Sequence, residues 1–286
     1  MNKLVISTES TCDLAPELVK EFEISVFNME YAVDDNIHRM GDGAYTMKGF
    51  YDCMRQGSAT RTTQVNEYEA TEYLESFLKQ GKDVIHLAFS SSLSGTYNNL
   101  AKAADVLSKK YPERRIAVVD SLCASSGQGL YAVIVAEYAK THAFDQTVAY
   151  AEELKHRIVH LFVVDDLKYL ARGGRISKAT ALLGNAIHMK PLMHMNKEGQ
   201  LVAFKKVLSR KKSLMALADI AAAKYDRDNP SVYVAHADCL EEAEFVADRL
   251  SASMGLKPRI MDLGMVIGCH SGPGTLAIFF TASERD

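Results

Sequence analysis

The stretch Val84-Ile-His-Leu-Ala-Phe89, followed without a break by Ser90-Ser-Ser-Leu-Ser-Gly-Thr96, decides the fold of this chain. The mostly apolar half predicts a buried strand, and the Ser- and Gly-rich half predicts a turn that opens the next helix. A strand that ends in a turn and continues into a helix leaves backbone N–H groups unpaired at the start of the helix, and these groups bind anions. The segment lacks the Gly-x-Gly-x-x-Gly spacing and the Gly-Lys pair of nucleotide sites. It therefore suits a single carboxylate better than a polyphosphate.

Two other hydroxyl-rich segments, Ser7–Asp13 and Ser121–Ser126, stand in the same position, after an apolar run and before a helical pattern. Strands at Leu4–Ile6, 84–89 and Ile116–Val119 alternate with helical patterns, which predicts a parallel, doubly wound sheet. Ligands of such sheets bind outside the carboxyl ends of the strands. All three hydroxyl-rich segments are expected at that edge.

The helices of the first half are expected to start at ordinary capping signals. Asp13 is the expected N-cap of a first helix with Pro16 in its first turn, and Asn66 is expected to cap residues 67–80. Further helices are expected at Thr46–Met54, Tyr97–Lys110 and Gly129–Lys140.

The pattern changes near residue 158, which predicts two domains, residues 1–158 and 159–286. The predicted fold is α/β, with an N-terminal parallel doubly wound sheet, a C-terminal α+β domain and the ligand between them. In the second half, Lys197-Glu-Gly199 predicts the turn of an antiparallel hairpin. An apolar run at 159–164 is followed by expected strands at 192–196, 200–208, 232–237, 259–263 and 275–281, and by expected helices at 166–171, 177–188, 210–225 and 241–254.

The composition is that of a soluble globular protein. The chain has 286 residues, is 48% hydrophobic and carries a formal net charge of −3. Its pI near 6.3 argues against a general nucleic-acid binder. No signal peptide is evident, and no apolar run is long enough to span a membrane. The five cysteines are widely spaced and the nine histidines show no metal-binding pattern, so we expect a cytoplasmic protein without disulfides, metal or cofactor.

Two segments carry the candidate site. Ser94-Gly95-Thr96 would form a carboxylate cradle, or would simply cap the following helix. His270 stands in Gly268-Cys-His-Ser-Gly-Pro-Gly274, which predicts a tight turn before the strand at 275–281. A histidine fixed there would donate hydrogen bonds to an anion, or would be held by the backbone alone.

Two other readings use overlapping residues. Ser94, His270 and Asp120 would make a hydrolase triad, although the chain has no Gly-x-Ser-x-Gly motif. Five cations in residues 205–212 would suit a nucleic-acid-binding regulator. A solvated face, or a docking patch for an acidic partner, explains them better in a chain that is net acidic.

In order, these motifs resemble the DegV family, the fatty-acid-binding subunits of bacterial fatty acid kinase. The resemblance covers essentially the whole chain, and no single motif carries it. It rests on Ser7-Thr-Glu-Ser-Thr-Cys-Asp-Leu14, Thr62-Thr-Gln64, Ser91-Ser-Leu-Ser-Gly-Thr-Tyr97, Val119-Asp-Ser121, Leu170-Ala-Arg-Gly-Gly-Arg-Ile-Ser177, Arg210-Lys-Lys212 and His270-Ser-Gly-Pro-Gly274.

The resemblance implies two α/β-type domains with a long-chain fatty acid buried between them. It implies that Thr62, Ser94 and His270 bind the carboxylate, with the Gly95 N–H as a helper, and that Arg210 serves the kinase partner. One motif departs from the family, because Thr62-Thr63-Gln64-Val65-Asn66 stands where Thr-Ser-Gln-Pro-Ser is usual. Thr63 therefore joins Thr62 as a candidate.

The implied function is that of a non-catalytic carrier. It would hold the tail, present the carboxylate to an ATP-dependent kinase and shield the acyl-phosphate from water. It needs no nucleic acid, and it leaves room for transient contact with a membrane. The runner-up function is a serine hydrolase of lipid esters that uses Ser94 and His270.

Overall fold

A computed structural model describes residues 4–176, 189–229 and 231–285. The first half contains β1 (Leu4–Glu9), the 3-10 turn η1 (Ser10–Cys12), α1 (Pro16–Glu21), β2 (Ser25–Phe27), β3 (Glu30–Val33), β4 (Asn36–Arg39), α2 (Met47–Arg55), β5 (Thr60–Thr62), α3 (Glu67–Lys79), β6 (Asp83–Ala88), α4 (Thr96–Lys110), β7 (Ile116–Asp120), α5 (Ser125–Ala139) and α6 (Phe144–Leu154).

The second half contains β8 (Ile158–Val163), α7 (Lys168–Arg172), β9 (Met189–Met195), β10 (Leu201–Leu208), α9 (Arg210–Lys224), β11 (Val232–His236), α10 (Leu240–Met254), β12 (Arg259–Asp262), α11 (Met265–Ser271) and β13 (Leu276–Thr281). The helix expected at 177–188 lies outside the described residues.

The predicted parallel sheet is confirmed. Its order is β2-β1-β6-β7, and each neighbouring pair is parallel. Every residue of β6 is buried, as expected for a parallel strand covered on both faces. The segments that follow β1, β6 and β7 therefore leave the sheet at one edge, as predicted from their hydroxyl-rich sequences.

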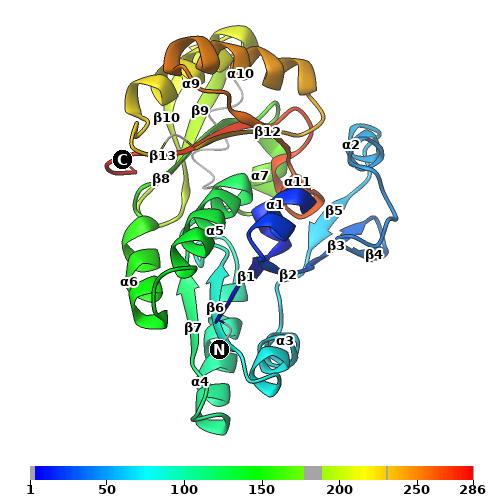
Figure 1. Ribbon diagram of the computed structural model, residues 1–286. Helices are drawn as coiled ribbons and strands as arrows, with labels where there is room; N and C mark the ends of the chain where they lie inside the picture. Colours follow the sequence, from blue (N-terminus) through cyan, green and yellow to red (C-terminus); the bar gives the residue numbers. More distant parts are fainter. Residues whose placement is uncertain (1–3, 177–188, 230, 286) are drawn as a thin grey trace.

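The second sheet is mixed and has the order β10-β9-β8-β13-β11-β12. The expected hairpin is confirmed as β9 and β10, which pair antiparallel. Helices α9 and α10 pack on one face of this sheet, where one of the hydrophobic clusters lies. Figure 1 shows this layer at the top of the molecule and the parallel sheet below it.

Helix α5 lies between the two sheets (Figure 1) and contacts β1 on one side and β8, β11 and β13 on the other. Its apolar sequence has no polar face, which is typical of a helix that is buried all round. It begins at Ser125, four residues before the predicted start. Sequence reasoning also missed α6, which packs against α5.

A third sheet, with the order β4-β3-β5, was not predicted. Its strands are three or four residues long, too short to give a clear alternating pattern. Arg61 and Thr62 lie in β5. Helix α11 packs against β3 and β5 from the C-terminal half of the chain. The division into 1–158 and 159–286 stays a prediction.

The predicted role of Asp13 as a helix N-cap is wrong. Asp13 ends η1 in a left-handed conformation with φ 48°, and the N-cap of α1 is Ala15. Its carboxyl turns inward, where Ser125 Oγ donates a hydrogen bond to Oδ2 at 2.6 Å. Within the described residues, every helix is too short or too polar to cross a membrane.

Candidate functional site

A cavity of about 300 Å³ lies between the carboxyl edge of the parallel sheet and the inner face of the mixed sheet. Two of its walls are the segments after β1, β6 and β7, and strands β8 and β13. Helix α11 forms a third wall. Most of the lining is apolar and includes Phe89, Leu93, Phe162, Met195, Leu201 and Phe279. The cavity suits a ligand with a long apolar part.

The residues predicted to bind a carboxylate lie together at one end of this cavity. Thr62, Ser94 and His270 all line it. Thr62 Oγ1 is 2.8 Å from His270 Nε2, although 208 positions separate the two in sequence. Ser94 Oγ accepts a hydrogen bond from the Thr96 N–H at 3.2 Å, and Ser94 stands one position before Gly95, the N-cap of α4. We call Thr62, Ser94 and His270 the head-group end.

His270 lies in the last turn of α11, so its predicted placement in a tight turn is wrong. The glycines and the proline expected to frame it form the turn that follows. Helix α11 is fixed by contacts at both ends. Tyr51 donates to the Leu263 carbonyl at 2.6 Å, and Thr60 Oγ1 donates to the Cys269 carbonyl at 3.2 Å.

Gly173, which follows α7, leaves the space that the His270 ring occupies. A Cβ on Gly173 would lie 2.4 Å from His270 Nδ1, closer than real atoms approach. The glycine pair after α7 was predicted only as a helix end. The structure gives its first glycine a second role, because it lets the ring reach Thr62.

Arg175 is a candidate site residue that sequence reasoning missed. It lines the cavity, and its guanidinium donates to two backbone carbonyls, Leu93 O at 3.2 Å and Gly173 O. In the described part of the chain no carboxylate pairs with Arg175 or with Arg172, which bonds to Thr60 Oγ1. The sequence feature that could have indicated Arg175 as a site residue is the run Gly173-Gly174-Arg175. Arg175 supplies a positive charge beside the neutral head-group end.

Desolvation lowers the pKa of His270 to about 4, and the charges of Arg175 and Arg172 add to this effect. The ring is therefore neutral at pH 7. Thr62 and Ser94 are neutral as well, so the positive charge that lines the cavity comes from Arg175. A carboxylate bound here is oriented by hydrogen bonds and attracted by a charge at short range.

The low pKa of His270 makes stability depend on pH. Between pH 6.5 and 4, the unfolded chain binds a proton that the folded chain rejects. The free energy of unfolding of the ligand-free protein should therefore fall as the pH drops through this window, with no contribution from His270 above it. Urea unfolding of the wild type and His270→Gln at several pH values measures the effect. The wild type should lose stability relative to the variant as the pH falls, and parallel curves would contradict the assignment.

Of the two other residues predicted at the ligand site, one lines the cavity and the other does not. Thr63 lines the cavity, and its Oγ1 is 3.4 Å from Glu30 Oε2. Gly95 is the N-cap of α4 and is not among the lining residues. A Cβ on Gly95 would lie 2.3 Å from Gln64 Oε1, so this glycine makes room for Gln64.

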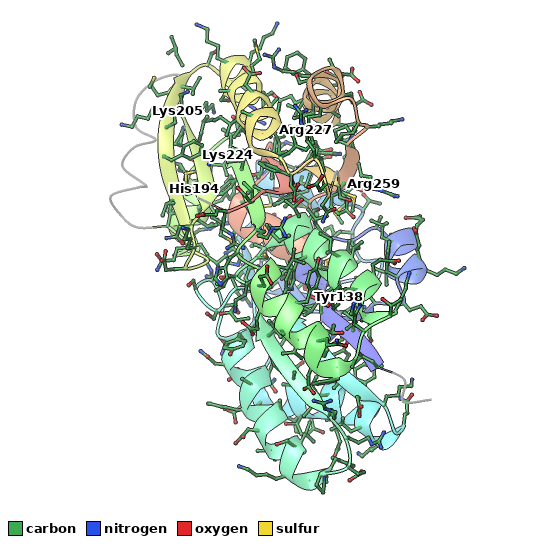
Figure 2. The ribbon with its side chains drawn as sticks, turned by 60° about the vertical axis from the view of Figure 1, so that its left-hand side comes forward. Tyr138, His194, Lys205, Lys224, Arg227 and Arg259 are labelled. Carbon is green, nitrogen blue, oxygen red and sulfur yellow. The ribbon has the colours of Figure 1, made fainter. Side chains whose placement is uncertain are left out.

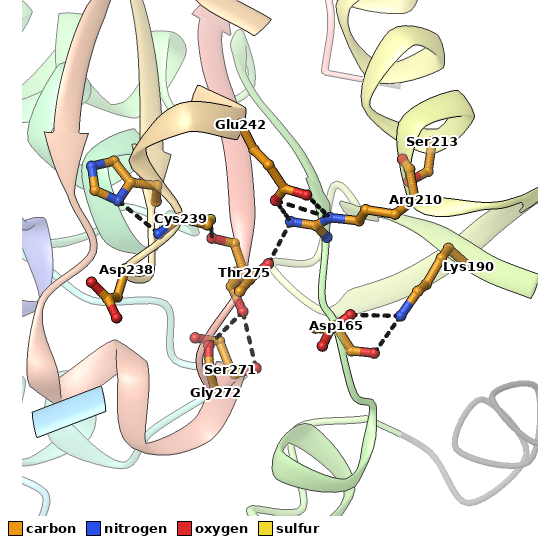
Figure 3. A network of polar contacts seen from close by, with 12 residues as sticks. Asp165, Lys190, Arg210, Ser213, Asp238, Cys239, Glu242, Ser271, Gly272 and Thr275 are labelled. Atoms are coloured by element: carbon orange, nitrogen blue, oxygen red, sulfur yellow. Dashed lines mark hydrogen bonds and ion pairs between the residues drawn. The ribbon is translucent and has the colours of Figure 1, made fainter. Parts of the chain in front are cut away.

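Arg210 is not among the residues that line the cavity, and Figure 3 shows it beside Glu242 and near Thr275. It lines a separate, polar pocket of about 520 Å³. Its Nη2 donates to Glu242 Oε2 at 2.6 Å and to the Gly274 carbonyl at 2.6 Å. Arg210 thus holds the turn that follows His270.

The described residues do not assemble the hydrolase triad. Asp120 Oδ1 accepts hydrogen bonds from the Ser91 and Leu122 N–H groups, and His270 Nε2 bonds to Thr62. Across the described ranges, no hydrogen bond joins Ser94 to His270. These ranges also hold no group of three or more His, Cys, Asp or Glu side chains placed to bind a metal.

Comparison with known proteins agrees with this architecture. A family model described as "Uncharacterised protein, DegV family" matches residues 3–283. A DegV domain-containing protein of Clostridium perfringens is 37% identical over 294 residues, with 100% of each chain covered. Another, from Lactococcus lactis, is 31% identical and has 96% of each chain covered.

Two solved structures are similar over the whole chain. DegV of Bacillus subtilis, described as a fatty acid binding protein, is 28% identical with a TM-score of 0.83, covering 99% of this chain and 100% of that one. A fatty-acid-binding DegV family protein of Thermus thermophilus is 26% identical with a TM-score of 0.86, covering 98% and 99%. This chain belongs to the DegV family.

Proposed function

We propose that this protein binds a long-chain fatty acid in the cavity, with its carboxylate at Thr62, Ser94 and His270. The observation that carries the proposal is the shape of the site, an apolar cavity with hydroxyls, an imidazole and Arg175 gathered at one end. The relatives from Bacillus subtilis and Thermus thermophilus, described as fatty acid binding, support it.

The energetics fit such a ligand. Burying a tail of about sixteen carbons contributes on the order of 10 kcal/mol, at roughly 0.8 kcal/mol per CH2, before the costs of ordering. The head group adds orientation. Three neutral groups hold the carboxylate by hydrogen bonds, and one nearby cation attracts it without the fixed geometry of a buried ion pair.

We further propose that the protein is a non-catalytic carrier that presents the carboxylate to an ATP-dependent kinase partner. The polar pocket supports this, because Pro273 and Gly274, which line it, belong to the turn that follows His270. Arg210, held by Glu242 and Gly274, is the proposed partner-binding residue. A partner that engages Arg210 would also contact the turn after His270.

The experiment that tests the binding proposal is native mass spectrometry of the purified protein, followed by organic extraction. A stoichiometric long-chain fatty acid is the expected result. Protein that is empty and fails to take up added stearic acid would overturn the proposal.

Alanine at the head-group end tests the placement of the carboxylate. Ser94→Ala and His270→Ala should each weaken stearic acid binding about tenfold, because each removes a hydrogen bond to a charged group. Ser92→Ala is the matched control. Ser92 lies in the same segment, but its Oγ donates to the Glu198 carbonyl and it does not line the cavity. Competition binding measures the affinity of each of the three variants for stearic acid. Equal affinities in all three would contradict the placement of the carboxylate at this end.

A further inference from the structure

The cavity has a second polar region, away from the head-group end. Thr11 and Ser125 line it, although most of the surrounding wall is apolar. Thr11 is 1% exposed and Ser125 is 4% exposed, so neither hydroxyl is solvated from outside. We call these two hydroxyls the inner hydroxyl pair.

Hydrogen bonds to buried residues fix the positions of both hydroxyls. Thr11 Oγ1 donates to Gln128 Oε1 at 2.8 Å, and Gln128 Nε2 is in turn held by Thr8 and Glu9, each at 2.8 Å. Ser125 Oγ bonds to Asp13 Oδ2 at 2.6 Å. The inner hydroxyl pair is thus part of a built polar network.

Each hydroxyl of the pair keeps unused hydrogen-bonding capacity. The Thr11 hydroxyl donates its proton to Gln128 Oε1 and retains both acceptor lone pairs. Desolvation raises the pKa of Asp13 to about 8, so this carboxyl is mostly protonated at pH 7 and one proton is shared with Ser125. Whether Ser125 donates or accepts in its hydrogen bond with Asp13, its hydroxyl can form a second hydrogen bond. A saturated tail leaves this capacity unused.

Helix α11 gives the distance between the two polar regions. A Cβ on Gly264, at the start of α11, would lie 2.3 Å from Asp13 Oδ1, so the Asp13 carboxyl adjoins this end of the helix. His270 is six positions further along, a rise of about 9 Å. Strand β8 lines the cavity here with His160, which accepts from the Ala124 N–H beside Ser125, and with Phe162. A tail that starts at His270 would pass the inner hydroxyl pair part-way along its length.

We propose that the inner hydroxyl pair is a subsite for a hydroxyl group in the middle of the acyl chain, and that hydroxylated long-chain fatty acids are preferred ligands. The inference rests on the proposed function, since it places the carboxylate at the head-group end. A ligand hydroxyl donates to Thr11 and exchanges a second hydrogen bond with Ser125. A site that bonds a ligand hydroxyl discriminates against the analogue without it, because part of the hydrogen-bonding capacity of its polar groups is then unused.

Competition between stearic acid and hydroxystearic acids, read by native mass spectrometry, tests the subsite. The hydroxyl is placed near the carboxyl, in the middle of the chain or near the methyl end. The wild type should prefer the mid-chain isomer over stearic acid by about fivefold, the value of one net hydrogen bond. Thr11→Val and Ser125→Ala should lose this preference, which is the ratio of the two affinities measured on the same variant. Ser92→Ala, outside the cavity, should keep it.

The possible outcomes distinguish failure of the subsite from failure of the proposed fatty acid binding. Stearic acid binding without a preference for any hydroxystearic acid overturns the subsite and leaves the fatty acid function standing. A preference that survives in both Thr11→Val and Ser125→Ala also overturns it. Failure of all these acids to bind overturns the proposed function, and the subsite with it. Thermal unfolding of each variant shows whether it is folded, and the two different substitutions keep the test valid if one of them is not.

Discussion

Replacing Arg285 by alanine is expected to lower the free energy of unfolding by about 3 to 5 kcal/mol. The side chain is 1% exposed, and no carboxylate within the described residues pairs with it. Its guanidinium instead donates to backbone carbonyls of Ile158 at 2.8 Å and Leu122 at 2.6 Å, and also to those of Lys155 and Asn196. Alanine would remove a donor from four backbone carbonyls, one in a buried hydrogen bond and three in part-buried ones.

Urea unfolding measures the loss, with Arg227→Ala as the control. Arg227 is exposed (Figure 2) and should lose almost nothing. Arg285→Lys should lose nearly as much as alanine, because a single ammonium group cannot reproduce the planar fork of donors. A loss below about 1 kcal/mol in Arg285→Ala would show that these carbonyls find other partners.

Replacing Glu9 should destabilise the protein and also weaken ligand binding. Glu9 is fully buried at the end of β1. Its Oε2 accepts from the Phe89 N–H at 3.0 Å and from Gln128 Nε2 at 2.8 Å, and its Oε1 lies 3.2 Å from His86 Nε2. One carboxyl thus joins the segments after β1 and β6 to helix α5. Glu9→Ala should cost about 3 kcal/mol, since it leaves the buried Phe89 N–H without its acceptor and takes one acceptor from Gln128 Nε2.

Glu9→Gln separates charge from shape. Glutamine fills the same space but replaces one acceptor oxygen by a donor, so it should cost about 2 kcal/mol. Glu17→Gln is the matched control, because Glu17 is exposed on α1. Urea unfolding and stearic acid competition are measured on all three variants. Unchanged stearic acid affinity in a folded Glu9→Gln variant would contradict the role of Glu9 in holding the cavity walls.

Arg285 and Glu9 act on the same part of the molecule from different sides. Arg285 fixes the backbone at Leu122, just before the start of α5, and Glu9 fixes Gln128 in its first turns. The wall that carries Ser125 is therefore set by two buried side chains, neither of which lines the cavity. This arrangement explains how a wall made of connecting segments is held in one shape.

The repeated change from strand to hydroxyl-rich segment was enough to predict the parallel sheet and the sheet edge beside which the cavity lies. Both follow from local periodicity and from the geometry of parallel strands. The short strands β3 to β5 and the helix α6 were missed for the same reason. They contain too few residues, or too weak a pattern, for periodicity to show.

The sequence by itself determined the family and the main sheet, and it predicted the three residues of the head-group end, because ordered motifs carry that information residue by residue. Only the tertiary structure decided how those residues meet. The hydrogen bond between Thr62 and His270 spans 208 positions and depends on α11 packing against β5. The inward turn of Asp13, the place of Arg175 in the cavity and the inner hydroxyl pair likewise depend on contacts between distant segments. Burial and hydrogen-bond satisfaction across the whole chain select such contacts, and no local pattern encodes them.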